Sequence, residues 1–522
     1  MRKITTILAM TFLLSLAANG QSRRFPYLSC TPDIVSDEVA GEANDEVVAT
    51  SRAGRVIRRL PSLRTEWDST RTYRSLVVLV EFSDLSFTLE DPLTFYNRLF
   101  NEKGFTQGVG VGCVADYFRS QSSGLLNLEF DVVGPVRVNH AAKGEKYGAS
   151  SFQAALQKVV DSLHIDFAPY DWNNDNQVEQ TVFVYAGYGG NEAAAVAKNS
   201  IWPNTSTHGV VTNSGISAFR FTASAELWSI GKSCGIGTIC HEFTHSLGLP
   251  DIYPTKNDDD YSVVDQWDLM DGGNFINNGW CPPNYSSLEK ILLGWAKPVV
   301  LDSAASIRNL KPVCEGGAVY KIINDANPNE YYLVENRQWV GWDLRLPGRG
   351  LLVTHVDYLA SSWSGNTVNN LPDHRRFDLV HADGRNYLDW AEIIGGKNPY
   401  VNGHHRNLST TPYPYVAEEN HIHNDSLTDH SVPAATMYTA NGKGSNLLGK
   451  PITNIVQNED GTVSFDFMGG VTIPSAIRTV EQTSGCQETF DLSGRQLSAF
   501  GKGRLVLVRK PDGTVKKVVK NK

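Results

Sequence analysis

The segment from Cys240 to Tyr253, CHEFTHSLGLPDIY, constrains the fold more than any other part of this 522-residue chain. It contains His241 and His245, and side chains four residues apart lie on one face of an α-helix, with Cβ atoms about 5–6 Å apart. Two imidazoles so placed can each offer one ring nitrogen to a Zn²⁺ ion, at about 2.0–2.1 Å. The pattern therefore predicts a helix that carries two metal ligands.

The neighbouring residues predict how this helix packs and where it ends. Apolar side chains follow a helical period that leaves out both histidines: Ile236, Ile239, Cys240, Phe243 and Leu247. Gly248 suits the left-handed position after a helix C-terminus, and Pro250 prevents the helix from resuming. Asp251 is the first carboxylate after this turn, where it can supply the third protein ligand that a catalytic zinc needs.

Two glutamates are candidates for roles at this site. Glu242 follows the first histidine, so we expect it beside the metal, where it can take a proton from a zinc-bound water. Glu289 is an alternative third ligand, on a predicted helix over 285–295. We favour Asp251, because the Gly-Leu-Pro turn brings it back toward the histidines, and we expect Glu289 to lie on a solvated helix face.

HExxHxxGxx followed by a third ligand is the pattern of the metzincin metallopeptidases, most of which have histidine in the third place. With aspartate there, HEFTHSLGLPDIY resembles the immune inhibitor A-like family of secreted bacterial metallopeptidases, whose motif is HExxHxxGLPDxY. The resemblance implies that His241, His245 and Asp251 bind zinc and that Glu242 is the general base. It also implies protein or peptide substrates.

A second segment, WDLMDGG at 267–273, resembles the Met-turn of that family. The resemblance implies that Met270 lies under the metal as an apolar floor. Some metzincins have a tyrosine two residues after this methionine, but Gly272 stands there in this chain. The resemblance therefore assigns no residue to oxyanion stabilisation.

A loop before the helix offers a candidate calcium site. Asp171, Asn173, Asp175 and Glu179 place oxygen-bearing side chains at alternate positions, which suits Ca²⁺. The loop is not an EF-hand, because Asn176 replaces the glycine at its sixth position. An Asn/Asp-rich turn that binds no ion is the alternative interpretation.

The order of predicted elements indicates an α/β (α+β), metzincin-like catalytic domain over 73–297, with the active-site helix at its base. Strands alternate with helices ahead of the motif: strands are expected at 75–82, 125–133 and 181–187, and helices at 114–120 and 152–163. Short apolar runs separated by turn residues then predict a mainly β accessory domain over 298–470. Three short strands are expected in a small β tail over 471–522, which resembles the sorting segments of exported Bacteroidetes proteins.

The amino-terminal region reads as a targeting and processing segment. Residues 1–20 combine two basic residues, a short apolar stretch and a small-residue cleavage site, which predicts a secretory signal peptide. Residues 21–72 are polar and predict a pro-segment, as in a zymogen, or a linker. The protein is therefore expected to be secreted, whether extracellular, at the cell surface or in the periplasm.

Composition narrows the classes of partner. A net charge of −9 without a long basic run argues against nucleic acid and anionic membranes as partners, and no apolar run after the signal reaches membrane-spanning length. The seven cysteines leave at least one without an intramolecular partner; a Cys234–Cys281 disulfide is conceivable.

These patterns together predict a secreted zinc-dependent endopeptidase. The alternatives are an exported surface-binding protein with a vestigial metal site and a zinc hydrolase that acts on non-peptide bonds. Zinc chemistry does not distinguish peptide from non-peptide substrates, so only the resemblance favours peptides.

Overall fold

The computed structural model describes residues 60–191, 199–228, 231–255, 262–385, 408–417 and 422–471, with short pieces between 488 and 519. The predicted signal peptide, most of the predicted pro-segment and Cys30 lie outside these residues. The chain divides into two compact units, Met1–Gly469 and Gly470–Lys522.

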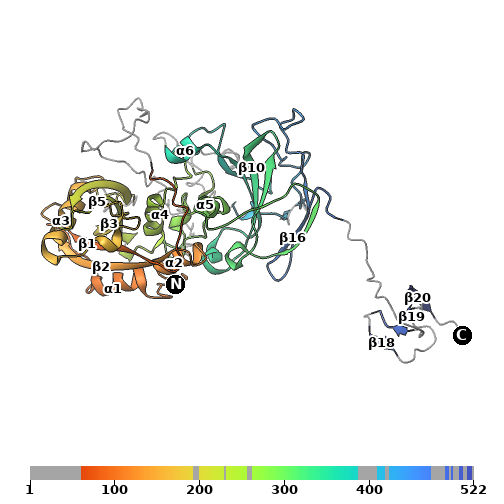
Figure 1. Ribbon diagram of the computed structural model, residues 1–522, viewed down its shortest axis with the longest axis horizontal. Coiled ribbons are helices and arrows are strands. Elements are labelled where there is room, and N and C mark those ends of the chain that lie inside the picture. Colours follow the sequence, from red (N-terminus) through yellow and green to blue (C-terminus); the bar gives the residue numbers. More distant parts are fainter. Residues whose placement is uncertain are drawn as a thin grey trace, which may run out of the picture. The chain divides into compact units, whose positions relative to one another are not determined.

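A mixed sheet of six strands opens the first unit (Figure 1). Its order is β2-β1-β3-β5-β4, with β6 paired to β5; β1, β2, β3 and β5 are parallel, whereas β4 and β6 are antiparallel to β5. The strands are β1 Thr72–Glu81, β2 Asn127–Arg137, β3 Thr181–Tyr188, β4 Asn204–Val211, β5 Ser217–Trp228 and β6 Lys232–Ser233.

Helices cover both faces of this sheet, which explains the continuous apolar run in β1. Val77 and Leu79 face one core that includes side chains of α1, α2 and α4. Leu76 and Val78 face a second core that includes α3. The helices are α1 Pro92–Asn101, α2 Val114–Gln121, α3 Ala149–Leu163 and α4 Gly237–Ser246. A parallel strand buried on both faces is expected to lack alternating polar residues.

Short helices lie between these elements and also within the following region, which is built mainly of β strands. They comprise η1 Ala168–Tyr170, η3 Asp265–Trp267, η4 Gly273–Phe275, α5 Ser287–Leu292, η5 Val313–Glu315, η6 Gly341–Arg345 and α6 Ala360–Ser364.

Three sheets make up the β-rich region: β12-β11-β10-β9-β7, β15-β16-β8 and β13-β14. Their strands are β7 Val299–Val300, β8 Ala305–Leu310, β9 Tyr320–Asn324, β10 Asn327–Arg337, β11 Gly350–Asp357, β12 Phe377–Leu379, β13 Tyr415–Ala417, β14 Ile422–Asn424, β15 Ile452–Gln457 and β16 Val463–Phe467.

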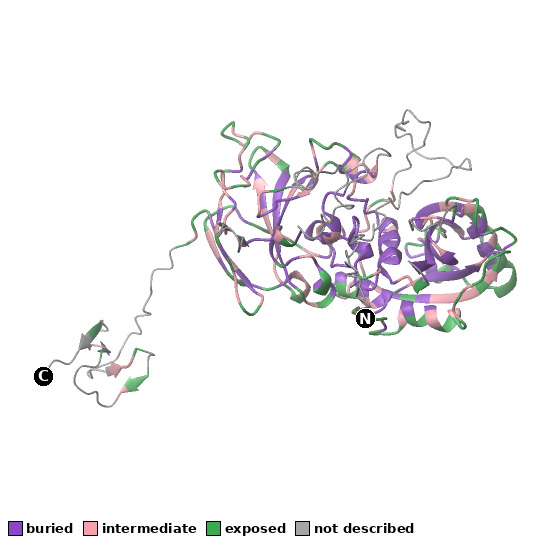
Figure 2. Cartoon of the chain, turned by 180° about the vertical axis from the view of Figure 1, so that it is seen from behind, coloured by how far each residue is buried: buried purple, intermediate pink, exposed green. Residues whose placement is uncertain are grey.

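One hydrophobic core extends across the predicted boundary at residue 297. Phe243 on α4 and Tyr285 share it with Leu333, Trp342 and Trp363 of the β-rich region. Buried positions accordingly continue from the surroundings of α4 into the sheet that contains β10 (Figure 2). The β-rich region therefore packs as part of the same body as the helix that carries the motif.

Several sequence expectations need correction. The helix predicted over 285–295 is only α5, Ser287–Leu292, because the chain turns through Gly294 with φ +70°. Cys234 and Cys281 form no disulfide with each other, so the conceivable Cys234–Cys281 disulfide is wrong.

The second unit contains a four-stranded sheet, β18-β17-β19-β20, where three strands were expected. The strands are β17 Glu488–Phe490, β18 Gln496–Leu497, β19 Leu505–Arg509 and β20 Val515–Val519. Among the described residues of both units, no helix is long and apolar enough to span a membrane.

Candidate metal centre

Helix α4 is fixed at both ends by glycines. At its start, a Cβ on Gly237 would lie 2.0 Å from the carbonyl oxygen of Asn274, so only glycine fits there. At its end, Gly248 has φ +95°, the left-handed conformation in which glycine avoids a steric cost. The described positions from Gly237 to His245 are all buried, so the helix lies in the core on every side and not only along its apolar stripe.

The backbone orients both histidine rings. Nδ1 of His241 lies 2.9 Å from the carbonyl oxygen of Leu269, and Nδ1 of His245 lies 2.8 Å from that of Leu249. A carbonyl oxygen can only accept, so each Nδ1 carries the proton and each Nε2 of a neutral ring presents a lone pair. This second interaction of a histidine ring is the one that typically fixes a metal ligand.

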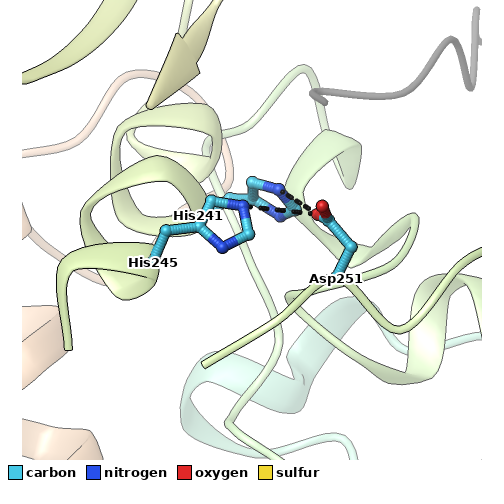
Figure 3. A group of neighbouring side chains, drawn as sticks. All are labelled: His241, His245 and Asp251. Atoms are coloured by element: carbon cyan, nitrogen blue, oxygen red, sulfur yellow. Dashed lines mark ion pairs between the residues drawn. The ribbon is translucent and has the colours of Figure 1, made fainter. Parts of the chain in front are cut away.

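Asp251 closes the group, as Figure 3 shows. Its Oδ1 lies 3.1 Å from Nε2 of His241 and 3.3 Å from Nε2 of His245, and all three residues are buried. Bonds of about 2.0–2.1 Å at tetrahedral angles separate two ligand atoms by about 3.3 Å, so these spacings fit one tetrahedral metal ion. Among the described residues, this is the one group of histidine, cysteine or carboxylate side chains able to hold a metal.

The protonation chemistry of these side chains also favours a cation between His241, His245 and Asp251. Two Nε2 lone pairs and a carboxylate oxygen face one another in a buried space where none of the three has a hydrogen-bond partner. Burial lowers the pKa of His245, but the nearby carboxylates of Asp251 and Glu242 and the carbonyl of Leu249 together raise that pKa to about 9. The three atoms therefore favour a positive charge between them, and the donor set fits a metal.

Glu242 lies on the same helix, buried beside strand β4. The hydroxyl of Thr205 donates to Oε2 of Glu242 at 2.9 Å and lies 2.7 Å from the Glu242 carbonyl oxygen. The carboxylate is thus held by a neighbour from the sheet and is absent from the three-residue metal group. Sequence reasoning missed Thr205, because nothing in the motif indicates which strand crosses the helix.

The predicted Met-turn links the two ends of the ligand set. The carbonyl of Leu269 accepts from His241, and the carbonyl of Met270 accepts the backbone N–H of Ile252 at 2.8 Å. Met270 itself is fully buried. The turn therefore fixes one histidine and the residue that follows Asp251.

The ring of Tyr253, the last residue of the motif, stacks on that of His241. The two ring centroids lie 6.5 Å apart at an interplanar angle of 10°.

Glu289 lies outside the group of His241, His245 and Asp251, and it does not face solvent. It is 2% exposed, and its Oε2 accepts from the backbone N–H and hydroxyl of Ser286, which forms a capping box at the start of α5. A capping glutamate satisfies helix-end donors, and burial here follows from packing against the shared core. The expectation of a solvated face is wrong.

The calcium candidate gains no support from the described loop. Its carboxylates are absent from any group within ligand distance. Asp171 accepts backbone N–H groups of Asp175 and Asn176, and Glu179 accepts the N–H of Trp172. These are the bonds of an Asn/Asp-rich turn, the alternative interpretation given above.

Comparisons with known proteins agree with this geometry. The model of the immune inhibitor A peptidase M6 catalytic domain matches residues 175–292. Immune inhibitor A of Bacillus thuringiensis subsp. alesti is 24% identical over 293 residues, which cover 44% of this chain and 42% of that protein. Pre-pro-metalloprotease PrtV of Vibrio cholerae serotype O1 is 24% identical over 288 residues, 45% of this chain and 30% of that protein.

The chain thus spans less than half the length of these relatives. The matched family segment nevertheless contains Glu242 and the three residues that the fold brings together, His241, His245 and Asp251. On this evidence residues 175–292 form a segment similar to the immune inhibitor A peptidase M6 catalytic domain, in a chain distantly similar to immune inhibitor A.

Proposed function

We propose that this chain is a secreted zinc-dependent endopeptidase, with His241, His245 and Asp251 as the zinc ligands. The observation that carries the proposal is the buried group of two Nε2 atoms and one carboxylate oxygen at tetrahedral spacing. The fold around it is then metzincin-like, with the third histidine replaced by aspartate. The name of PrtV, a pre-pro-metalloprotease, is in keeping with an export signal over 1–20 and a pro-segment over 21–72.

Glu242 is the residue to which we assign proton transfer. Zinc, when bound, polarises the scissile carbonyl and makes a water acidic enough to lose a proton near neutral pH. Glu242 takes that proton and delivers it to the leaving amine, while Thr205 holds the carboxylate in place. Substrates are proteins or peptides, in line with the peptidase family.

Two substitutions test these assignments separately. Glu242→Gln keeps the shape and the acceptor for Thr205, so it should retain about one zinc per chain and lose about 10²–10⁴-fold in casein cleavage. Asp251→Ala removes a ligand and should lose zinc as well as activity. Elemental analysis and a casein assay on both variants and the parent are the measurements.

The outcomes discriminate between the functions weighed above. Equal activity in the parent and Glu242→Gln would remove the proton-transfer role. A parent that binds zinc without cleaving peptides would favour a hydrolase of other bonds. A parent without zinc would make a surface-binding protein the better description.

A further inference from the structure

Asn366 reaches Asp251 from a distant part of the chain. It follows helix α6 in the β-rich region, 115 residues after the aspartate. Its Nδ2 donates to Oδ2 of Asp251 at 2.8 Å, and its Oδ1 accepts the backbone N–H of Asp251 at 2.7 Å. Both side chains are buried, with Asn366 7% exposed. One amide therefore holds the carboxylate and its own backbone at once.

Because of this contact, the two carboxylate oxygens of Asp251 have different neighbours. Oδ2 is bound to the amide, while Oδ1 faces the two imidazole Nε2 atoms. Rotation of the carboxylate would leave Oδ2 buried without a donor, which is costly. The amide thus keeps a single oxygen directed at the point where the histidines converge.

The backbone of Asn366 is built for this contact. Its φ is +53°, a left-handed value that asparagine tolerates better than most residues. Its carbonyl accepts the hydroxyl of Thr255 at 2.6 Å, and Asn370 accepts the N–H of Thr255 at 2.7 Å. Asn369 donates to the carbonyl of Ile252 at 2.7 Å. Three asparagines therefore hold the 251–255 turn against the β-rich region.

We propose that Asn366 is a positioning residue of the metal centre, which makes Asp251 a single-oxygen ligand and completes the site from outside the family segment. That segment ends at residue 292, so the β-rich region is part of the metal centre rather than a separable accessory. The inference rests on the proposed zinc site. Partners that orient metal ligands are typically worth about 10–100-fold in metal affinity.

The test compares two glycine substitutions. Asn366→Gly keeps the left-handed backbone accessible and removes both contacts with Asp251. The matched control is Asn454→Gly, because Asn454 has φ +54° and donates its Nδ2 to Oδ2 of Asp466 at 2.9 Å, an aspartate outside the metal group. The zinc dissociation constants of the full chain and both variants are measured by competition with a chelating indicator.

Asn366→Gly should bind zinc about 10–100-fold more weakly than the parent, and Asn454→Gly within about threefold of it. With Co²⁺ in place of zinc, the visible absorption should weaken in Asn366→Gly alone, since a second carboxylate oxygen would raise the coordination number. Equal zinc affinities in the parent and both variants would overturn the inference while leaving the proposed function intact. A parent that binds no zinc would overturn both.

A crystal structure of the zinc-loaded parent tests the same point if Asn366→Gly does not fold. One oxygen of Asp251 on zinc and the other on Asn366 is the expected result. Both oxygens on the metal, or Asn366 turned away, would contradict the proposal.

Discussion

Asp268 in the predicted Met-turn and Glu289 in α5 bring two carboxyl groups together in the core. Both are almost completely buried, and neither Oδ2 of Asp268 nor Oε1 of Glu289 has a hydrogen-bond donor. Burial raises the pKa of each, and the charge of Asp268 raises that of Glu289 further. Two adjacent buried carboxyls cannot both ionise cheaply, so Glu289 keeps a proton and shares it with its neighbour.

This pair predicts a pH-dependent difference in stability between the parent and Glu289→Gln. A carboxyl whose folded-state pKa is raised stabilises the fold most below the unfolded pKa, and the contribution is lost as pH rises through the folded pKa. Glutamine keeps the capping acceptor for Ser286 and donates permanently to Asp268. As pH rises above about 5, the free energy of unfolding of the parent should fall relative to that of the variant, by up to about 1.4 kcal/mol per pH unit. Denaturant titrations at each pH measure the free energy of unfolding of both proteins. The same pH dependence in the parent and the variant would contradict the shared proton.

Local sequence spacing predicts the three residues that the fold brings together, His241, His245 and Asp251, but it does not predict the residues that hold them in place. His241 and His245 are separated by one helical turn and Asp251 by one further turn of chain, so their convergence follows from short-range geometry. Asn366 is 115 residues away and Thr205 is 37 residues from Glu242. No periodicity or motif records a contact at that separation, because it depends on how sheets and helices pack. The burial of Glu289 escaped prediction for the same reason.

At the scale of elements, the end of α4 is held by an extended segment, residues 60–67, which we call the strap. The N–H of Arg64 donates to the carbonyl of Leu247 at 3.1 Å, and the indole of Trp67 donates to the carbonyl of Leu293 at 2.7 Å. The strap belongs to the described part of the predicted pro-segment, residues 60–72. A Cβ on Gly248 would lie 2.8 Å from Cα of Leu63 in the strap.

Gly248→Ala should therefore destabilise the protein more than its backbone strain alone predicts. A left-handed alanine costs about 1–3 kcal/mol, and the contact with strap backbone should add about 1–3 kcal/mol of overpacking. The matched control is Gly316→Ala, since Gly316 has φ +80° and open space around its Cβ position. Unfolding by denaturant should show the larger loss at residue 248. Equal losses of stability in the two variants would mean that the strap moves away from the added Cβ without a measurable loss of free energy.

Elements with strong local patterns were predicted well, and those with mixed patterns were missed. The expected strand at 181–187 corresponds to β3, and the expected helix at 114–120 to α2. Strand β4 has the sequence NTSTHGVV, and its polar residues do not predict a buried strand. The loop that ends α5 depends on Gly294. A Cβ added at this position would lie 2.8 Å from the carbonyl oxygen of Thr65 in the strap. Such a long-range contact sets a boundary that local propensity cannot supply.

For the whole molecule, the shared core ties the motif to the β-rich region. Leu333, Trp342 and Trp363 belong to the same cluster as Phe243 of α4. The fully buried guanidinium of Arg337 binds both oxygens of Asp343 at 2.7 Å and donates to the carbonyl of Asn284 at 3.1 Å, across residue 297. Removing one side of such a buried ionic contact leaves an uncompensated charge or orphaned partners. The segment before 297 is therefore incomplete as a folding unit.

A chain ending at residue 297 should consequently neither unfold cooperatively nor bind zinc, whereas a chain ending at 470 should do both. Burial of an apolar side chain contributes about 1.5–3 kcal/mol, so losing Leu333, Trp342 and Trp363 alone removes about 5–9 kcal/mol, comparable with the whole stability of a typical domain. The longer truncation removes residues 471–522, which is the second unit except for Gly470, so its unfolding midpoint should match that of the full chain. Circular dichroism with denaturant and zinc analysis compare the three proteins. A cooperative transition with one zinc per molecule in the chain ending at 297 would show that the motif region folds alone and that Asn366 is dispensable. A shifted unfolding midpoint in the chain ending at 470 would show that the carboxy-terminal unit stabilises the rest of the protein.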